Sequence, residues 1–305
     1  MRIRLLILLL ASVVLTLLSS AHLHAARQEV EDVMADAGGE HLRLETPFGP
    51  VHLWRPATYR EYTAGMVIYI HGYYTSVDKT WTDDHLAAQF RDSGRNALFI
   101  TVEAPQSNAE DVYWKSLDDL LGALANLSPF PLPAGPLVVV GHSGAYRTIL
   151  GWLPNPRLRE LILLDAMYGG ESEFRYWLRS APRATPHRMV LVAIDTAKQS
   201  NRFARRVPGT ARRRGIPAEA NSFTARQAQA RLLYLRSQYD HAALVSSGRV
   251  IPVLLQVSSL RSFEELKAPP TRTGSVRRHR RNGRGATSGV ARVSSTRSSV
   301  AASSP

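Results

Sequence analysis

The sequence of 305 residues contains no cysteine, which excludes disulfide bonds and thiolate metal sites. It also has no group of aspartate, glutamate and histidine at metal-ligand spacing and no glycine-rich phosphate-binding loop. These absences favour chemistry that needs neither a metal nor another cofactor. Without disulfides the fold depends on its core, and a hydrophobic content of 44% is ample for one.

Long apolar runs are scarce, and the run at the N-terminus is short for a membrane span. Leu5–Leu18 follows Arg2 and Arg4 and precedes several small residues. This pattern predicts a signal peptide over residues 1–25, and therefore an exported protein that is periplasmic or secreted. The alternative is an uncleaved segment that anchors the chain to a membrane.

Acidic residues are absent from residues 271–305, which hold eight of the arginines behind the net charge of +13. A second arginine cluster, between Arg202 and Arg214, is interrupted by proline and glycine and is expected to be a loop. Neither cluster has the interleaved aromatic residues that stack bases, so no specific nucleic-acid partner is expected. Residues 266–305 are predicted to be a disordered tail, with weak contact to an anionic envelope surface as its one expected interaction.

The rest of the chain alternates short apolar runs with segments of helical spacing. Strands are expected at 41–46, 51–55, 66–70, 96–102, 137–140, 161–164 and 189–194. Helices are expected at 80–91, 112–127, 171–179 and, as one long amphipathic helix, 222–238, whereas 250–257 is apolar but interrupted by Pro252. Such alternation predicts a three-layer α/β/α sandwich with a mostly parallel central sheet in residues 41–265. The polar residues 26–40 are expected to be a linker.

The segment Leu137–Leu150 reads LVVVGHSGAYRTIL, an apolar run that enters a small-residue turn and then a segment able to form a helix. Small residues on both sides of Ser143 permit a sharp bend that exposes its hydroxyl at the end of a buried strand. The segment resembles the nucleophile elbow of the α/β-hydrolase superfamily, Gly-x-Ser-x-Gly, with Ala145 in place of the last glycine. Alanine is small enough for that departure to be tolerated. The resemblance covers roughly residues 66–255 and implies a serine hydrolase.

A serine hydroxyl needs a base to take its proton, and histidine is suited to this because its ordinary pKa is about 6.5. The resemblance implies the order serine, acid, late histidine, which makes His241 the candidate base. His71 competes, although in this superfamily a histidine before a glycine more often supports the oxyanion loop. The acid is either Asp165 or Asp195, at the ends of successive strands. Asp165 is preferred because a compact turn follows it, whereas Lys198 could neutralise Asp195.

The resemblance further implies an oxyanion hole formed by the backbone N–H groups of Gly144 and Tyr73. Together these features predict an exported esterase-like or lipase-like serine hydrolase without cofactor or metal. Its substrate would be a small-molecule or lipid-like acyl compound, cleaved at an ester, thioester or amide bond through an acyl-enzyme on Ser143. The alternative is a non-catalytic binding or scaffolding protein on the same fold.

Overall fold

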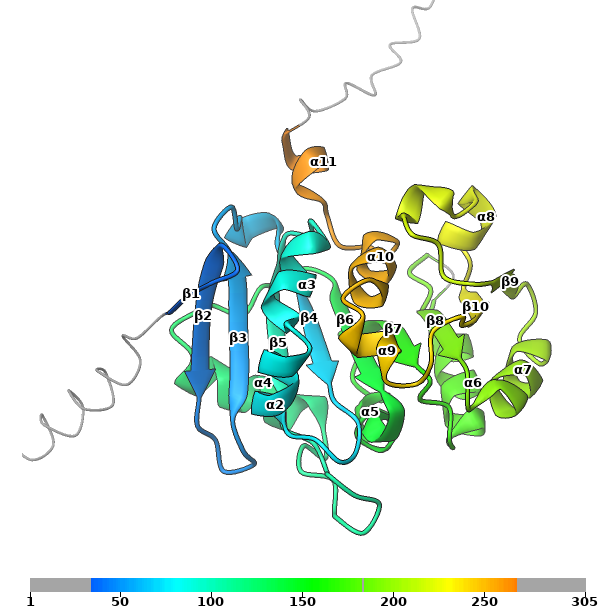
Figure 1. The fold of residues 1–305 in the computed structure, drawn as a ribbon, viewed down its shortest axis with the longest axis horizontal. Coiled ribbons are helices and arrows are strands. Elements are labelled where there is room, and N and C mark those ends of the chain that lie inside the picture. The colour runs from blue at the N-terminus through cyan, green and yellow to red at the C-terminus, as the bar shows by residue number, and fades with distance from the viewer. Residues whose placement is uncertain (1–33, 183, 268–305) are drawn as a thin grey trace, which may run out of the picture. The chain divides into compact units, whose positions relative to one another are not determined.

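The computed structural model of the chain describes residues 34–182 and 184–267. Within these residues ten strands form one sheet in the order β1-β2-β3-β5-β4-β6-β7-β8-β10-β9 (Figure 1). The strands are β1 (Met34–Asp36), β2 (Gly39–Leu44), β3 (Val51–Pro56), β4 (Gly65–Ile70), β5 (Ala97–Val102), β6 (Leu137–His142), β7 (Leu158–Leu164), β8 (Arg188–Ala193), β9 (Ala211–Arg214) and β10 (Leu232–Arg236). From β5 to β9 all neighbouring strands are parallel, whereas β1, β2 and β3 join as antiparallel neighbours at one edge.

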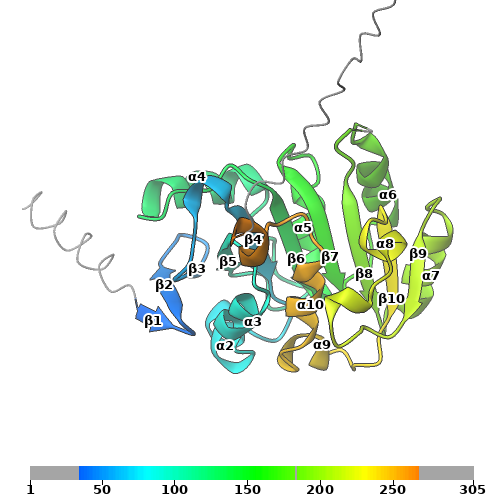
Figure 2. The same ribbon diagram turned by 90° about the horizontal axis from the view of Figure 1, so that it is seen from above.

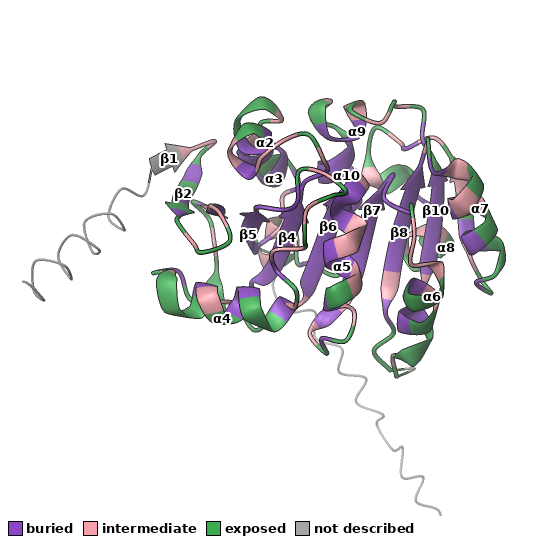
Figure 3. Cartoon of the chain, turned by 90° about the horizontal axis from the view of Figure 1, so that it is seen from below, coloured by how far each residue is buried: buried purple, intermediate pink, exposed green. Residues whose placement is uncertain are grey.

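Helices cover both faces of this sheet, as the two turned views show (Figures 2 and 3). They are α2 (Val77–Asp83), α3 (Leu86–Asp92), α4 (Leu117–Leu127), α5 (Tyr146–Trp152), α6 (Glu171–Ser180), α7 (Ala197–Arg205), α8 (Ala225–Ala228), α9 (Ala243–Ser246), α10 (Val250–Gln256) and α11 (Phe263–Lys267), with 3₁₀ turns η1 (Glu61–Thr63), η2 (Ser143–Ala145) and η3 (Ala220–Ser222). Apolar side chains of α4 to α7 pack on one face, and those of α2, α3, α9 and α10 pack on the other. The predicted three-layer sandwich with a mostly parallel sheet is confirmed.

The central strands contribute to both layers of the core because their side chains alternate between the two faces of the sheet. In β4, Met66, Ile68 and Ile70 belong to one buried cluster, while Val67 and Tyr69 belong to the other. All of β4 is buried, as expected for a parallel strand with helices on both sides. Burial on both faces of the sheet fixes where the central strands end. The candidate site forms at the edge of the sheet made by these strand ends.

The prediction of one long helix over 222–238 is wrong. The segment holds the end of η3, the short helix α8 and the strand β10, which lies between β8 and β9 in the sheet. Leu232, Leu233 and Leu235 are buried against neighbouring strands. Periodicity alone does not distinguish a short apolar run in a strand from one in a helix, and here the sheet decides.

The arginine-rich segment is only in part the expected loop: residues 206–210 form a turn, but the arginines on either side lie in α7 and β9. Arg202 lies on α7 and pairs with Glu171, whereas Arg212 lies on the edge strand β9. The Arg212 guanidinium donates to the side-chain oxygen of Asn201 at 2.9 Å and lies 5.1 Å from the ring centre of Tyr234. These partners allow a run of arginines to form the edge of a sheet, where charge also discourages pairing with another chain.

Two other helix predictions change in detail. The helix expected at 80–91 is two helices, α2 and α3, separated at His85, whose φ of 51° is left-handed. Pro252 does not interrupt its segment but lies in the first turn of α10. There a missing N–H removes no intrahelical hydrogen bond.

The sheet begins earlier than the sequence predicts, since β1 starts at Met34 inside the expected linker over 26–40. Its pairing with β2 places Met34 opposite His41. At the other end α11 continues to Lys267, past the expected start of the tail at residue 266.

The expected signal peptide and the remainder of the tail lie outside the described residues. No helix in the described part of the chain is long and apolar enough to span a membrane.

Candidate active site

The residue of the elbow, Ser143, lies in the turn between β6 and α5. Its φ of 52° is a left-handed value that a non-glycine residue rarely adopts, as expected where a strand turns sharply into a helix. A Cβ on Gly141 would lie 2.4 Å from Cδ1 of Ile149, so only glycine lets α5 approach the strand this closely. Ala145, the departure from the motif, is 2% exposed and packs in the core. An alanine therefore fits at that position.

A second turn, formed by His71–Tyr74 after β4, lies directly over the elbow. A Cβ on Gly72 would approach Cβ of Ser143 to 2.8 Å, and a Cβ on Gly144 would approach the ring of Tyr73 to 2.4 Å. Two glycines therefore permit this contact. The backbones of the two turns lie side by side, next to the serine hydroxyl.

This contact brings together two backbone N–H groups that have no intramolecular acceptor within the described residues. Gly144 lies in the first turn of η2, where the N–H groups have no partner one turn earlier. The N–H of Tyr73 is likewise unpaired there, while the next N–H, of Tyr74, donates to the carbonyl of Gln106 at 2.8 Å. The Tyr73 hydroxyl accepts from Arg147 at 3.2 Å, which helps to fix the turn. The arrangement can hold an oxyanion.

His71 is only 1% exposed and holds this turn in place through its hydrogen bonds. Its Nδ1 donates to the carbonyl of Gly72 at 2.7 Å, and its Nε2 lies 2.8 Å from Oε1 of Glu103. The other oxygen of Glu103 accepts from the N–H of Val77 at 3.0 Å. The pair thus ties the ends of β4 and β5 to the start of α2. His71 lines the cavity described below, but its nitrogens are engaged in positioning the turn.

The other candidate histidine, His241, follows β10 and reaches the end of β7. Its Nδ1 lies 2.7 Å from Oδ2 of Asp165 and 3.7 Å from Oδ2 of Asp195. The Asp165 side chain is completely buried, whereas that of Asp195 is 62% exposed. Of the two acids that the sequence left open, the structure pairs Asp165 with the imidazole.

The carboxylate of Asp165 is also held by the chain that follows β8. Oδ1 accepts from the N–H of Ile194 at 2.9 Å and from the N–H and hydroxyl of Thr196 at 3.0 and 2.6 Å, while Oδ2 accepts from the N–H of Asp195 at 3.0 Å. Burial opposes ionisation, but the hydrogen bonds from His241 and from these groups hold the pKa of Asp165 well below its ordinary range. Asp165 is therefore a fixed anion, and Asp195 contributes its backbone N–H to that anion.

The Asp165 carboxylate changes the pKa of the His241 imidazole. The hydrogen bond that His241 donates to Asp165 raises the pKa of His241, burial opposes the rise, and the charges of Asp195 and Asp240 add to it. With Nδ1 engaged, Nε2 is the nitrogen left for proton transfer.

His142, beside the serine, has a structural contact with the same loop. Its Nε2 donates to the carbonyl of His241 at 3.0 Å, and the two rings lie 4.6 Å apart between their centres. Burial lowers the pKa of His142 to about 4, and the nearby His241 acts in the same direction. His142 is therefore neutral near pH 7 and anchors the loop that carries the candidate base.

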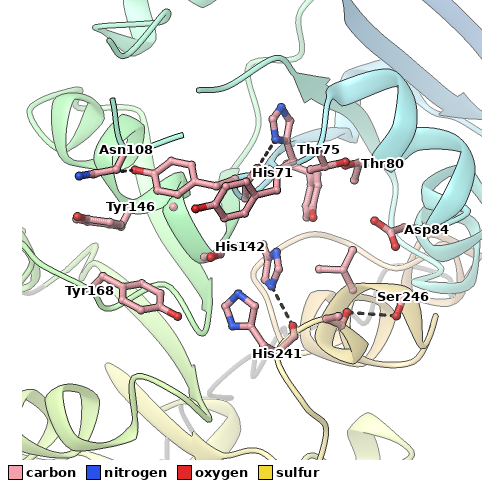
Figure 4. Close-up of a pocket in the computed structure, with 18 residues that line it drawn as sticks. His71, Thr75, Thr80, Asp84, Asn108, His142, Tyr146, Tyr168, His241 and Ser246 are labelled. Atoms are coloured by element: carbon pink, nitrogen blue, oxygen red, sulfur yellow. Dashed lines mark hydrogen bonds between the residues drawn. The ribbon is translucent and has the colours of Figure 1, made fainter. Parts of the chain in front are cut away.

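Ser143, His241 and the two turns that carry the N–H groups of Gly144 and Tyr73 line one cavity of about 640 Å³ (Figure 4). It contains the candidate nucleophile, base and oxyanion donors together with many aromatic side chains. Its lining residues are Tyr69, His71, Gly72, Tyr73, Tyr74, Thr75, Thr80, Asp84, Asn108, His142, Ser143, Gly144, Tyr146, Tyr168, His241, Ala242, Val245 and Ser246. The volume is typical of a site for a small molecule.

Asp165, Asp195 and His241 offer one potential metal-ligand atom each within 4.8 Å of one another. The hydrogen bonds to Asp165 nevertheless occupy both of its oxygens with five donors, and a carboxylate has about four lone-pair sites. A metal would have to displace several of these donors. The cluster is arranged as a hydrogen-bonded acid and base.

The sequence did not indicate two further residues of the cavity, Tyr168 and Asp84. Tyr168 lies in the turn after Asp165, and its ring centre is 6.4 Å from that of His241. Burial raises the pKa of Tyr168 to about 12, with the charges of Asp165 and Asp195 in the same direction and contact with Ser143 opposing. The compact turn of five residues after Asp165 could have drawn attention to Tyr168. Nothing in the pattern around Asp84 separates it from an exposed helix residue.

The sheet order, the serine elbow after the central strand and the late histidine define the α/β-hydrolase fold. No family model matches the chain, and no curated protein is similar to it in sequence. Among solved structures, the feruloyl esterase module from Clostridium thermocellum is similar with a TM-score of 0.48 and 10% identity, over 71% of this chain and 88% of that one. A fluorophosphonate-binding serine hydrolase of Staphylococcus aureus is similar with a TM-score of 0.48 and 12% identity, over 72% of this chain and 99% of that one. An S-formylglutathione hydrolase from Agrobacterium tumefaciens is similar with a TM-score of 0.43 and 12% identity, over 73% of this chain and 96% of that one.

Proposed function

We propose that this protein is a serine hydrolase that cleaves an ester, thioester or amide bond through an acyl-enzyme on Ser143. The observation that carries the proposal is the hydrogen bond of 2.7 Å between the buried Asp165 and His241, whose imidazole lines the same cavity as Ser143. A fixed carboxylate behind an imidazole, beside a serine on a strained turn, is the arrangement that activates a hydroxyl.

In the proposed mechanism Oγ of Ser143 attacks the carbonyl carbon of the substrate, and its proton passes to Nε2 of His241. The carbonyl oxygen becomes an oxyanion that accepts from the N–H groups of Gly144 and Tyr73, whose loss typically costs about 10²- to 10³-fold per donor. His241 then protonates the leaving group, and the acyl group remains on Ser143. Water, deprotonated by His241, releases the acid and restores the serine.

A fluorophosphonate probe tests this proposal directly. Oγ of Ser143 should displace fluoride from the phosphorus, giving one stable adduct per chain that peptide mass mapping locates on the peptide containing Ser143. The reaction needs an activated serine but no knowledge of the substrate. Protein denatured before the probe is added is the control and should remain unlabelled. Folded protein that takes up no label, or takes it up elsewhere, would favour the non-catalytic alternative.

The pH dependence of hydrolysis should report on His241. The base acts in its neutral form, and Asp165 raises the pKa of His241 above its ordinary value of about 6.5. Activity, measured as kcat/KM on p-nitrophenyl butyrate, should therefore fall as the pH drops through a pKa above 6.5. Because Asp165→Asn removes the main cause of the rise, the residual activity of that variant should decline at a lower pH. If kcat/KM of this variant fell with decreasing pH over the same pH range as that of the wild-type protein, the assignment of His241 as the base would be contradicted.

A further inference from the structure

The cavity has two ends of different character. Figure 4 shows Asn108, Tyr146 and Tyr168 at one end and Thr75, Thr80, Asp84 and Ser246 at the other, with His142 and His241 between them. The second end is formed by α2 with its C-cap residue Asp84 and by α9, which follows the candidate base. It is therefore adjacent to the reacting groups without being part of them.

Asp84 supplies the one carboxylate among the residues that line this cavity, and the lining contains no lysine or arginine. Its side chain is half-buried and has neither a hydrogen bond nor an ion pair within the described residues. The two neighbouring carboxylates are paired, Asp78 with Arg43 and His52, and Asp83 with Lys79. Asp84 is thus an acid that faces the cavity and has no partner in the fold.

The electrostatic surroundings of Asp84 leave a cation as its best partner. Burial raises the pKa of its carboxyl group, the charge of Asp83 adds to the rise, and Lys79 and His85 oppose it. A positive charge beside the carboxylate would stabilise the ionised form and offset the cost of burial.

One aromatic ring, that of Tyr69, lines the cavity near Asp84. Tyr73 lies toward the other end, where its hydroxyl donates to Oδ1 of Asn108 at 3.4 Å. Burial and the charge of Asp84 raise the pKa of Tyr69 well above its ordinary value, so its hydroxyl keeps its proton. The faces of such rings attract alkylammonium groups, and a carboxylate adds direct charge pairing.

We propose that Asp84, with Tyr69 near it, forms a cation subsite, and that the substrate is an acyl compound carrying an alkylammonium group. The inference deepens the proposed function, because it assigns a substrate class to the cavity of Ser143. The ammonium group would lie against Asp84 while the scissile carbonyl lies between Ser143 and the oxyanion donors. Hydrogen-bonded or paired contacts to a charged group change affinity by about tenfold to 100-fold.

Binding to Ser143→Ala measures this subsite without turnover. Two matched pairs differ only in a positive nitrogen against a neutral carbon: butyrylcholine against 3,3-dimethylbutyl butyrate, and the ethyl ester of 4-(trimethylammonio)butanoate against ethyl 5,5-dimethylhexanoate. The first pair places the charge on the alcohol side and the second on the acyl side. By calorimetry, the charged member of at least one pair should bind about tenfold or more tightly than its neutral counterpart.

Two variants in the same Ser143→Ala background identify the source of any preference. Asp84→Asn, which keeps the shape of the side chain, should reduce the preference to less than about threefold. Asp83→Asn removes the same charge one residue away, from an exposed side chain paired with Lys79, and should leave the preference unchanged. Equal binding within both pairs, or a preference that survives Asp84→Asn, would overturn the cation subsite.

This design separates the subsite from the chemistry. Fluorophosphonate labelling of the wild-type protein tests Ser143 whatever the charge of the substrate. Labelling without a cation preference would overturn the subsite and leave the hydrolase. A cation preference without labelling would keep Asp84 as a binding group and remove the acyl-enzyme.

Discussion

Replacement of Ser143 by alanine should lower kcat/KM for p-nitrophenyl butyrate on the order of 10⁶-fold, the size of loss seen when a nucleophile is removed from such a site. The expected loss is this large because no other hydroxyl lies on the strained turn between β6 and α5. Only oxyanion stabilisation and binding would remain, and these give a residual rate above that of water alone. The measurement is release of p-nitrophenol, with circular dichroism to verify that the variant is folded.

The matched control for this experiment is Ser172→Ala. Ser172 is an exposed serine at the start of α6 whose hydroxyl donates to Glu173. It lies outside the cavity, so its removal should change the rate by less than about twofold. If Ser143→Ala retained more than about 1% of the wild-type activity, another group would have to be the nucleophile.

Asp165→Asn should lower kcat by about 10⁴-fold, since an asparagine behind a catalytic histidine no longer holds the required tautomer. The carboxylate of Asp165 is fully buried and 2.7 Å from Nδ1 of His241, and it accepts hydrogen bonds from residues 194–196. An amide in its place presents an N–H group to donors and loses the charge that stabilises the imidazolium. Single-turnover kinetics with p-nitrophenyl butyrate would measure the acylation step.

Asp195→Asn is the comparison that distinguishes the two acids. Its side chain is 62% exposed and 3.7 Å from the imidazole, so the loss should be less than about tenfold. Its backbone N–H, which donates to Asp165, is retained in the variant. Comparable losses in both variants would mean that the two carboxylates act together and that the single-acid assignment is wrong.

The serine turn could be predicted from the sequence because it is a local structure. Gly141 is small for a reason that lies on the adjoining helix, where its Cβ would meet Ile149, and β-branched residues mark the strand before it. The strand ends and the parallel sheet followed from the same kind of pattern. His241 could be placed as the late histidine only through the resemblance to α/β-hydrolases.

Local pattern gave a preference for Asp165 but could not settle the choice against Asp195, because both follow buried apolar strands. The choice depends on how the loop after β10 crosses the sheet, which positions His241 over the end of β7. The sequence pattern predicted a helix where the structure has β10, because the burial that makes residues 232–236 a strand comes from the neighbouring strands β8 and β9. Neighbours distant in sequence decided both cases.

By itself, the sequence determined the layered α/β architecture and the serine elbow, because both depend on short-range spacing of apolar and small residues. Only the tertiary structure decided which carboxylate meets His241 and that Asp84 faces the same cavity as Ser143. Those relations join segments from different strands and helices. No local pattern carries them, because they arise when separate strand ends and helix ends meet at one edge of the sheet.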